Sequence, residues 1–226
     1  MPDRLRFCDD ETAVDALTFA RRASRLAEDA VRLQATGGVL AMTAAALAPR
    51  GLGDATPTVL GMRAVAADPE LVCDIVVVAS ALEADPHDAR QLVLPATGLA
   101  PAWAGLAPPR GGWAEREAVD AATLAAKAQG GMARVASALP ADPGEDVVRA
   151  VRAGVWGEPE PEFDGLPLGV AFAAVALGFI SGSEAARAFT SGRWTRLTLR
   201  RGHVLVRGPV ASGLTPVRAT GGGLSR

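Results

Sequence analysis

The sequence has few of the residue types that usually carry acid–base chemistry or bind metals. It has no tyrosine, a single lysine (Lys127), two histidines and two cysteines. Cys8 and Cys73 lie among apolar neighbours, so a disulfide framework is not implied. His87 and His203 are separated from each other and from both cysteines without the spacing of metal ligands. We therefore expect no metal and no cofactor, and few candidates for proton transfer.

Membrane-spanning and targeting segments are also missing from the sequence. The longest unbroken apolar stretch covers residues 166–180 and contains both Pro and Gly. It falls short of the roughly 20 residues that a bilayer requires, so we interpret it as a buried helix. The start of the chain lacks the charged region, apolar run and cleavage site of a signal peptide. These features predict a cytoplasmic protein without a membrane contact.

Charge is distributed unevenly along the chain, although the net charge is only −2. Residues 1–180 hold 15 basic and 24 acidic side chains, whereas residues 181–226 hold eight arginines and one acid, Glu184. Such an asymmetry indicates a basic surface near the end of the chain. An acidic, proline-spaced linker at residues 158–164 is the obvious internal counterpart.

The first half of the chain has the two-residue periodicity of strands. After a short strand at residues 4–7 and a helix capped by Asp9, a meander of four antiparallel strands is expected. The second and fourth of these strands are apolar on both faces and need cover on both sides, from helices, a second sheet or a partner subunit. The four strands are predicted at residues 31–35, 39–48, 58–66 and 71–82, and a further one at 91–95.

The second half is predicted to be helical up to a closing hairpin. A helix over residues 114–139 should kink or divide at Gly130-Gly131. Another should begin at residues 142–145 and end at Gly157, and the capping pattern from Ser181 to Glu184 predicts a short helix to about residue 190.

Together these elements predict an α+β protein, with an antiparallel meander sheet of four to six strands covered by helices and a C-terminal β-hairpin. We expect one domain over residues 1–219, sheet-rich at 1–97, helix-rich at 113–190 and closed by the hairpin at 193–208. The glycine-rich residues 220–226 should form a flexible tail. The doubly apolar strands and the apolar helix further suggest a homodimer.

The closing hairpin gives the most specific functional hypothesis. With Arg201-Gly202 as its turn, Arg196 would face Arg207 and Arg200 would face His203, while the aliphatic side chains pack inward. Like charges placed opposite each other are destabilising, so something negative should lie nearby. The alternatives are a phosphate-bearing ligand, nucleic acid, or the acidic linker. The predicted ligand-binding residues are Arg193, Trp194, Arg196, Arg200, His203 and Arg207.

A second hypothesis concerns Asp74, a carboxylate in an apolar strand. An isolated buried carboxylate is unfavourable, and the four-residue turn at 67–70 would place Arg63 directly across from it. The alternatives are a structural Arg63–Asp74 pair, a catalytic acid or base, or an exposed edge position. His87, in a turn, is the other candidate acid or base.

The sequence thus favours a binding or interaction protein that recognises an anionic ligand through its C-terminal arginines. An anionic small molecule or an acidic protein surface would be the partner. Nucleic acid is less favoured, because the whole chain is acidic and carries no recognition motif. The alternative is a metal-free, cofactor-free enzyme for a small anionic substrate, with Asp74 or His87 as acid or base and Arg63 orienting the substrate.

Overall fold

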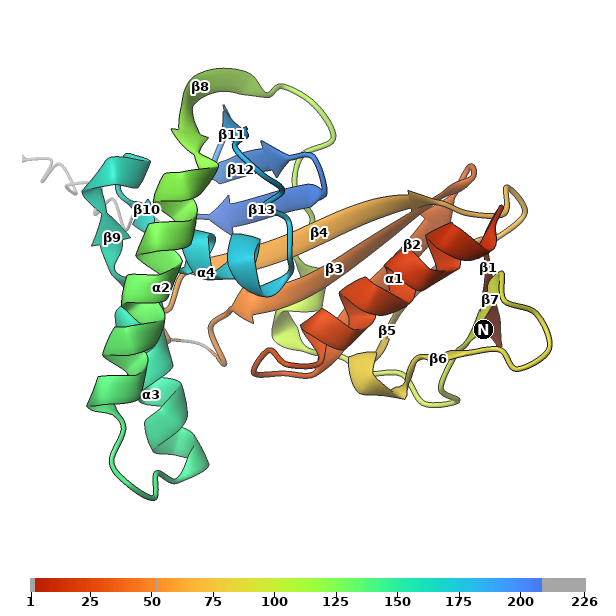
Figure 1. The fold of residues 1–226 in the computed structure, drawn as a ribbon, viewed down its shortest axis with the longest axis horizontal. Coiled ribbons are helices and arrows are strands. Elements are labelled where there is room, and N and C mark those ends of the chain that lie inside the picture. Colours follow the sequence, from red (N-terminus) through yellow and green to blue (C-terminus); the bar gives the residue numbers. More distant parts are fainter. Residues whose placement is uncertain (1–2, 52, 209–226) are drawn as a thin grey trace, which may run out of the picture.

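The computed structural model describes residues 3–51 and 53–208 and shows the α+β class that the sequence predicts. Its main feature is an eight-stranded antiparallel sheet with the order β5-β2-β3-β4-β13-β12-β11-β8 (Figure 1). The strands are β2 (Ala30–Thr36), β3 (Val39–Leu47), β4 (Thr58–Ala66), β5 (Cys73–Val78), β8 (Ala114–Asp120), β11 (Ala185–Ser191), β12 (Trp194–Leu199) and β13 (Gly202–Arg207).

The first and second halves of the chain share this sheet. Strand β13 pairs with β4 from His203 opposite Met62 to Arg207 opposite Thr58, so the C-terminal hairpin extends the sheet of the first half. The sheet is therefore continuous across the midpoint of the chain. The single-domain prediction for residues 1–219 stays a prediction, and the predicted tail at 220–226 lies outside the described residues.

The order of the first strands differs from the predicted meander, because β5 pairs with β2 instead of β4. The connection after β4 crosses the end of the β2–β3 hairpin, where the amide of Ala67 donates to the carbonyl of Gly38 at 2.9 Å. Strand β5 then starts with Cys73 opposite Ala35. Four strands in the order 4-1-2-3 form a Greek key.

Helices cover one face of the sheet (Figure 1). Asp9 caps the first helix as expected, since its Oδ1 accepts from the amide of Thr12 at 2.7 Å. The apolar segment 166–180 contains a buried helix, shorter than predicted. Within the described part of the chain, no helix combines the length and hydropathy needed to cross a bilayer. The helices are α1 (Asp10–Ala23), α2 (Ala121–Ala138), α3 (Glu145–Gly157) and α4 (Gly169–Ala176).

Two glycines allow the end of α4 to lie directly on the sheet. A Cβ atom at Gly61 of β4 would fall 1.9 Å from Cδ1 of Leu177, and one at Gly202 of β13 would fall 2.4 Å from the ring of Phe179. Both distances are far below van der Waals contact, so a larger residue at either position would require Leu177 or Phe179 to move. Leu177 and Phe179 are consequently fully buried.

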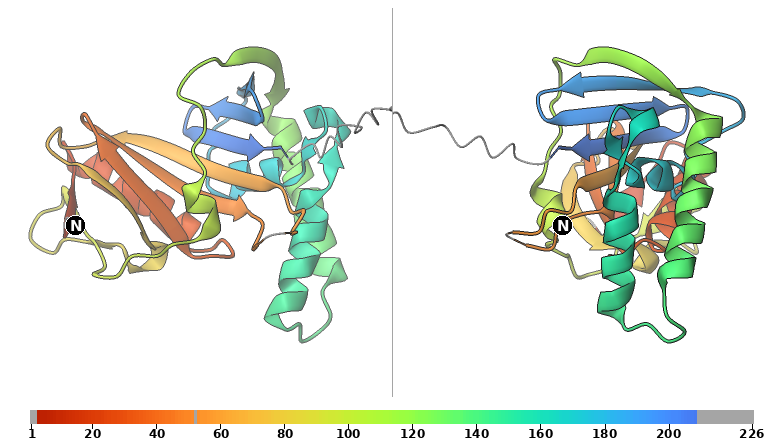
Figure 2. Two further views of the ribbon diagram at one scale, coloured as in Figure 1. Left: turned by 180° about the vertical axis from the view of Figure 1, so that it is seen from behind. Right: turned by 90° about the vertical axis from the view of Figure 1, so that its left-hand side faces the viewer.

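The opposite face of the sheet is covered by the long connection between β7 (Gln91–Val93) and β8 (Figure 2). Trp103 of this connection is buried in a second apolar cluster with Leu60, Trp194 and Leu205. Other segments of the same chain thus cover both faces of the doubly apolar strands. The need to cover apolar surfaces therefore no longer supports a homodimer, which stays a prediction.

Two segments predicted to be helical are strands, which enlarges the sheet to eight. Residues 114–120 form β8, and residues 185–191 form β11, where Ala186 and Ala188 alternate as buried residues. The predicted capping contact at Ser181 exists, because its amide donates to Oε1 of Glu184 at 2.9 Å, but a strand follows it. Strand pairing outweighs the local helix signal: β11 pairs with β12 and β8, and β8 pairs with β11 at the edge of the sheet.

The predicted division into two helices at Gly130-Gly131 is wrong, because α2 runs through both glycines. The alternative, a kink at these glycines, stays a prediction. Gly131 lies against Trp156 of α3, and a Cβ atom there would fall 2.1 Å from the indole ring. The close packing of α2 and α3 explains why a helix contains glycine at this point.

Short elements complete the fold. A three-stranded sheet, β1-β7-β6, packs at one end of the molecule, and β9 and β10 form a two-stranded ladder near α2 (Figures 1 and 2). The described part of the chain also contains three 3₁₀ helices. The bounds are β1 (Arg4–Arg6), β6 (Glu83–Ala84), β9 (Pro159–Glu160), β10 (Leu166–Pro167), and 3₁₀ turns at Ala79–Ala81, Ala102–Gly105 and Pro161–Phe163.

Candidate functional site

The C-terminal hairpin has the predicted strands but a different turn. Leu199 pairs with Gly202, so the two turn residues are Arg200 and Arg201. The register is displaced by two residues from the predicted one, and the pairs Arg196–Arg207 and Arg200–His203 are wrong. Because side chains alternate with a period of two, this displacement keeps each side chain on its predicted face. The observed opposite pairs include Trp194–Arg207, Arg196–Leu205 and Thr198–His203.

Arg196 is half-buried and contacts two aromatic rings. Its guanidinium carbon is 4.6 Å from the ring centroid of Trp113 and 4.8 Å from that of Phe189. Its Nε is buried and has no hydrogen-bond partner among the described residues. Cation–π contacts partly compensate for the burial of this nitrogen. Trp113 therefore covers part of the predicted arginine face.

His203 is also a structural member of this face. Its Nδ1 lies 3.0 Å from Oγ1 of Thr198. Burial, and secondly the charge of Arg196, lower the pKa of His203. The imidazole is consequently neutral near neutral pH and adds no positive charge to the hairpin.

The remaining hairpin residues lie at its two ends. Arg193, in the β11–β12 turn, donates from Nη2 to the carbonyl of Gly208 at 2.8 Å. Arg200, in the β12–β13 turn, donates its backbone amide to Oε2 of Glu184 at 2.9 Å. The structure thus groups four of the six predicted residues on one face and separates these two arginines.

The acidic linker does not neutralise the hairpin, so that alternative is wrong. It pairs with α2, where Nζ of Lys127 lies 3.0 Å from Glu160 and 2.6 Å from Glu162. Nη2 of Arg134 lies 2.6 Å from Glu158. The chain's single lysine therefore has a structural role, and the hairpin arginines lack these carboxylates.

Asp74 pairs with Arg32, not with Arg63. Nε and Nη2 of Arg32 each donate to one carboxylate oxygen of Asp74 at 2.8 Å, and Gln34 donates at 3.1 Å. The hydrogen bonds from Arg32 hold the pKa of Asp74 below its usual value. The predicted Arg63–Asp74 pair is wrong because β5 pairs with β2, and strands β2 and β3 separate β5 from β4. Asp74 is half exposed at this edge of the sheet.

His87 is exposed in the loop between β6 and β7, and its backbone amide donates to Oδ1 of Asp85 at 2.8 Å. This loop belongs to the small sheet, whereas Asp74 lies on the edge strand of the large one. Catalytic roles for Asp74, His87 and Arg63 stay predictions.

Arg63 instead contributes to a polar hollow between α1, β4 and the hairpin turn. Its Nε donates to Oδ2 of Asp15 at 2.6 Å, and its Nη1 donates to the carbonyl of Arg201. These contacts join the first helix, the centre of the sheet and the hairpin. The hollow has a volume of about 340 Å³ and is lined by Asp15, Thr18, Phe19, Arg22, Arg63, Leu177 and Arg201.

Helix α1 supplies one wall of the hollow. Asp15, Phe19 and Arg22 are spaced by four and three residues, which places them on one helix face. Arg22 donates from Nη1 to the carbonyl of Leu177 at the end of α4, at 3.2 Å. Gly178 has a φ of +69°, and a Cβ atom there would lie 2.0 Å from Nη1 of Arg22. Arg22 was not among the residues predicted from the sequence, although its seven-residue spacing from Asp15 is visible there.

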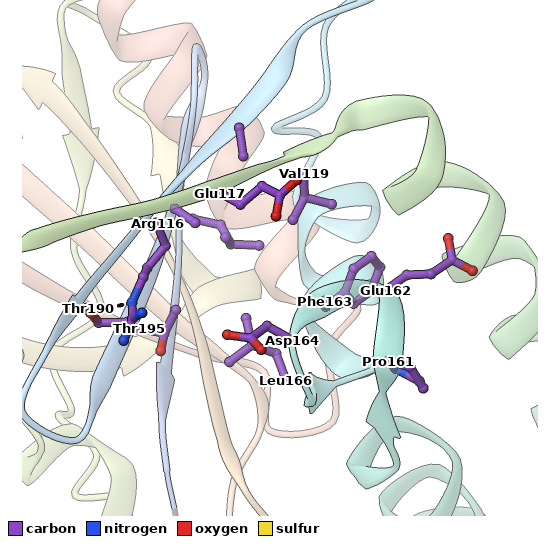
Figure 3. Close-up of a pocket in the computed structure, with 13 residues that line it drawn as sticks. Arg116, Glu117, Val119, Pro161, Glu162, Phe163, Asp164, Leu166, Thr190 and Thr195 are labelled. Atoms are coloured by element: carbon purple, nitrogen blue, oxygen red, sulfur yellow. Dashed lines mark hydrogen bonds between the residues drawn. The ribbon is translucent and has the colours of Figure 1, made fainter.

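A larger cleft lies between the outer strands and the turn that connects β9 to β10 (Figure 3). Its volume is about 510 Å³. Glu117, Glu162 and Asp164 line it against a single arginine, Arg116, so its net charge is negative. It suits an anion poorly, and the arginine-lined hollow is the better candidate for the ligand predicted from the sequence.

Comparison with known families divides the chain in two. Residues 1–105 match a domain of unknown function, DUF8010, and residues 108–211 match another, DUF8185. No curated protein matches the chain. The boundary between the two matches falls in the connection that leads from β7 to β8, and the two matched parts share the large sheet through the β4–β13 pair.

Several solved structures are similar to the chain at low identity. The DNA polymerase sliding clamp from Caulobacter crescentus is 12% identical, with a TM-score of 0.47 over 91% of this chain and 65% of that one. A putative DNA polymerase III beta subunit from Eubacterium rectale is 9% identical, with a TM-score of 0.47 over 90% and 64%. This chain therefore spans less than two thirds of the length of these proteins. At such identities and TM-scores the likeness assigns no function. By sequence, the chain matches two adjacent domains of unknown function.

Proposed function

We propose that this protein is a non-enzymatic binding protein that recognises an anionic group, such as a phosphate, in the hollow formed by Arg22, Arg63 and Arg201. The observation that supports it is the composition of the hollow, in which three guanidinium groups and one carboxylate surround about 340 Å³. Guanidinium suits phosphate because its planar fork binds two oxygens at once.

The charge balance of the hollow favours an added anion. Asp15 compensates Arg63. Arg22 contacts only the dipole of the Leu177 carbonyl through the hydrogen bond described above, and a carbonyl carries no full charge. The side chain of Arg201 forms no ion pair with any residue that the structure describes, and the residue is exposed. Two positive charges are thus left for a ligand, which matches a phosphate monoester near neutral pH.

The structural roles of Arg22 and Arg63 support the proposal and do not compete with it. Arg22 places a cation at the carbonyl end of α4, and Arg63 ties α1 to the hairpin turn. These contacts use part of each guanidinium and restrict its orientation. Ordered donors bind a ligand with a smaller loss of conformational entropy.

The hairpin residues predicted from the sequence belong to this proposal in two ways. Arg200 adjoins Arg201 in the turn and would reach a ligand that extends beyond one phosphate. Trp194 belongs to the second apolar cluster, and Arg196 contacts Trp113, which packs against that cluster. These two residues, with His203 and Arg207 on the same face, would support the hairpin and not contact the ligand. Arg193, at the other end of the hairpin, would then take no part in binding.

Calorimetric titration with inorganic pyrophosphate tests the proposal. Binding should be saturable, should weaken with salt, and should weaken about tenfold or more in Arg201→Ala, because one charge-assisted contact contributes roughly 1.5–3 kcal/mol. Arg193→Ala, which removes the same charge from the same hairpin, should bind like the parent. Equal binding by Arg201→Ala and the parent would refute the proposal.

A further inference from the structure

The sheet face opposite the helices carries aromatic and basic side chains on strands β11, β12 and β13. Phe189 lies opposite Arg196, and Trp194 lies opposite Arg207. Trp113 packs against Arg196 from the connection before β8. All of these except Trp194 are half-buried, so part of each side chain is open to solvent. The name Trp113 face is used below for Trp113, Arg187, Phe189, Arg196 and Arg207.

The chain itself does not balance the charge of the Trp113 face. Arg187 pairs with Glu115 at 2.9 Å, whereas Arg196 and Arg207 form no ion pair with any described residue. Residues 209–226, which follow β13 in the sequence, contain no aspartate or glutamate, so their side chains supply no counter-charge. The face therefore has two uncompensated positive charges.

A third arginine without an ion pair among the described residues lies at the rim of this face. Arg110 is exposed, and its segment is tied to the end of β11 by two hydrogen bonds. Nε1 of Trp113 donates to the carbonyl of Pro109 at 3.1 Å, and Oγ of Ser191 donates to the carbonyl of Gly111 at 3.3 Å. Arg110 therefore extends the basic surface beyond Trp113.

The aromatic contacts of Arg196 restrict its guanidinium without using all of its donors. Among its nitrogens only Nε is buried without a partner, so the terminal nitrogens stay accessible. A planar guanidinium can donate to both oxygens of a carboxylate, and a donor that is already ordered loses less conformational entropy on binding. Arg196 is thus prepared to bind an external acid.

The composition of the face favours a protein over nucleic acid as the partner. Trp, Phe and Arg are enriched in protein–protein interfaces, and Trp and Arg are frequent among the residues that contribute most to binding. The rings of Trp113 and Phe189 are half-buried and contact Arg196, which leaves less ring surface for the base stacking that single strands use. Residues 1–180 also hold 15 basic and 24 acidic side chains, and this excess of acid repels a long polyanion more than a short acidic segment.

We infer that the Trp113 face docks an acidic segment of another protein. Carboxylates of the segment pair with Arg196 and Arg207, and an apolar side chain packs on the exposed parts of the two rings. This surface lies on the opposite side of the sheet from the arginine hollow, where Arg63 contacts helix α1. The inference does not depend on the proposed function.

Fluorescence anisotropy with a labelled peptide of eight glutamates and two phenylalanines tests the inference. The peptide should bind saturably and more weakly as salt is added. A peptide in which glutamine replaces every glutamate should bind at least about tenfold more weakly, because the carboxylates carry the recognition. Equal binding of the two peptides, or no saturable binding of the acidic one, would overturn the inference.

Two variants locate the binding surface. Arg196→Gln and Arg207→Gln should each weaken binding of the acidic peptide by about tenfold. Arg207 makes no side-chain hydrogen bond with the described residues, so Arg207→Gln keeps the test valid if Arg196→Gln does not fold. Arg116→Gln removes the same charge from the cleft side of β8 and should bind like the parent. A loss of the same size in Arg116→Gln would show that net charge, and not this face, is responsible.

Two further titrations separate the alternatives. A labelled oligothymidylate of the same length should bind more weakly than the acidic peptide, and equal or tighter binding would assign the face to nucleic acid instead. Arg201→Ala should bind the acidic peptide like the parent even if it loses pyrophosphate binding. A failure of the proposed function is thereby distinguished from a failure of this inference.

Discussion

Arg63 and Asp15 connect strand β4 to helix α1 through a hydrogen bond of 2.6 Å between Nε and Oδ2. The same guanidinium donates to the carbonyl of Arg201 in the hairpin turn. One side chain therefore joins three segments that are far apart in the sequence, and it does so beside the proposed ligand. Its carboxylate partner sets how much positive charge the hollow offers.

Replacing Asp15 by Asn should strengthen anion binding. The change removes the one carboxylate that lines the hollow among the described residues, and it leaves Arg63 uncompensated. Pyrophosphate should bind more tightly to Asp15→Asn than to the parent, while the unfolding free energy falls by about 0–1 kcal/mol, as for other partly exposed pairs. Calorimetry and urea denaturation measure both effects. Glu83→Gln, an exposed change outside the hollow, controls for net charge, and an affinity gain of the same size in that variant would rule out a local cause.

His203 should make stability depend on pH. Because burial lowers its pKa in the folded state, the unfolded chain takes up a proton first as the pH falls. The free energy of unfolding should therefore decrease as the pH drops below about 6.5, the ordinary pKa of histidine, towards the folded pKa. Urea denaturation across this range should show a smaller slope in His203→Gln. His87→Gln, at the exposed histidine, should keep the slope of the parent, and equal slopes in all three proteins would contradict the assignment.

The Asp74–Arg32 pair predicts a pH effect in a lower range. The pKa of Asp74 is lowered in the folded state, so the pair stabilises the fold above the ordinary pKa of aspartate, about 3.9, and loses that contribution as the pH falls through the folded value. Asp74→Asn should reduce stability by up to about 1 kcal/mol near neutral pH, given the exposure of the carboxylate. The difference between variant and parent should shrink in acid. A difference that persists unchanged at about pH 2 would show that charge is not its cause.

The two glycines of α2 should respond oppositely to alanine. Gly130 has open space where a Cβ atom would lie, so Gly130→Ala should raise the unfolding free energy by up to about 1 kcal/mol. At Gly131 the added atom would fall 2.1 Å from the ring of Trp156, and Gly131→Ala should lower it by about 1–3 kcal/mol. Chemical denaturation of the pair measures the difference, and equal effects would show that the α2–α3 contact is not close packed.

Local sequence patterns predicted the individual strands of this fold better than they predicted which strands pair with each other. Alternation in residues 194–207 identified both strands and the face of every side chain, because these depend only on a period of two. The turn was predicted one residue too late, at Arg201-Gly202 instead of Arg200-Arg201. This displaces the strand pairing by two residues, and both pairings satisfy that period. Arg63 was predicted as the partner of Asp74, and the structure shows Arg32 instead. Local patterns do not determine this partner, because it depends on strand order, and strand order depends on where the connection after β4 crosses the sheet.

The candidate site was only partly predictable for the same reason. The basic charge of the C-terminal segment and the importance of Arg63 were visible in the sequence. Their proximity was not, because Arg63 and Arg201 meet only through the pairing of β4 with β13. Arg22 lies on an ordinary amphipathic helix, and its contact with the end of α4 is what distinguishes it.

The most direct test of an anion site in the hollow is a nuclear magnetic resonance titration that follows the Nε–H signals of the arginines as pyrophosphate is added. The signals of Arg22, Arg63 and Arg201 should shift together with one dissociation constant, and the signal of Arg193 should not move. In Arg201→Ala the remaining two should shift only at much higher concentration. Shifts confined to other arginines, or no saturable shift at all, would contradict the account.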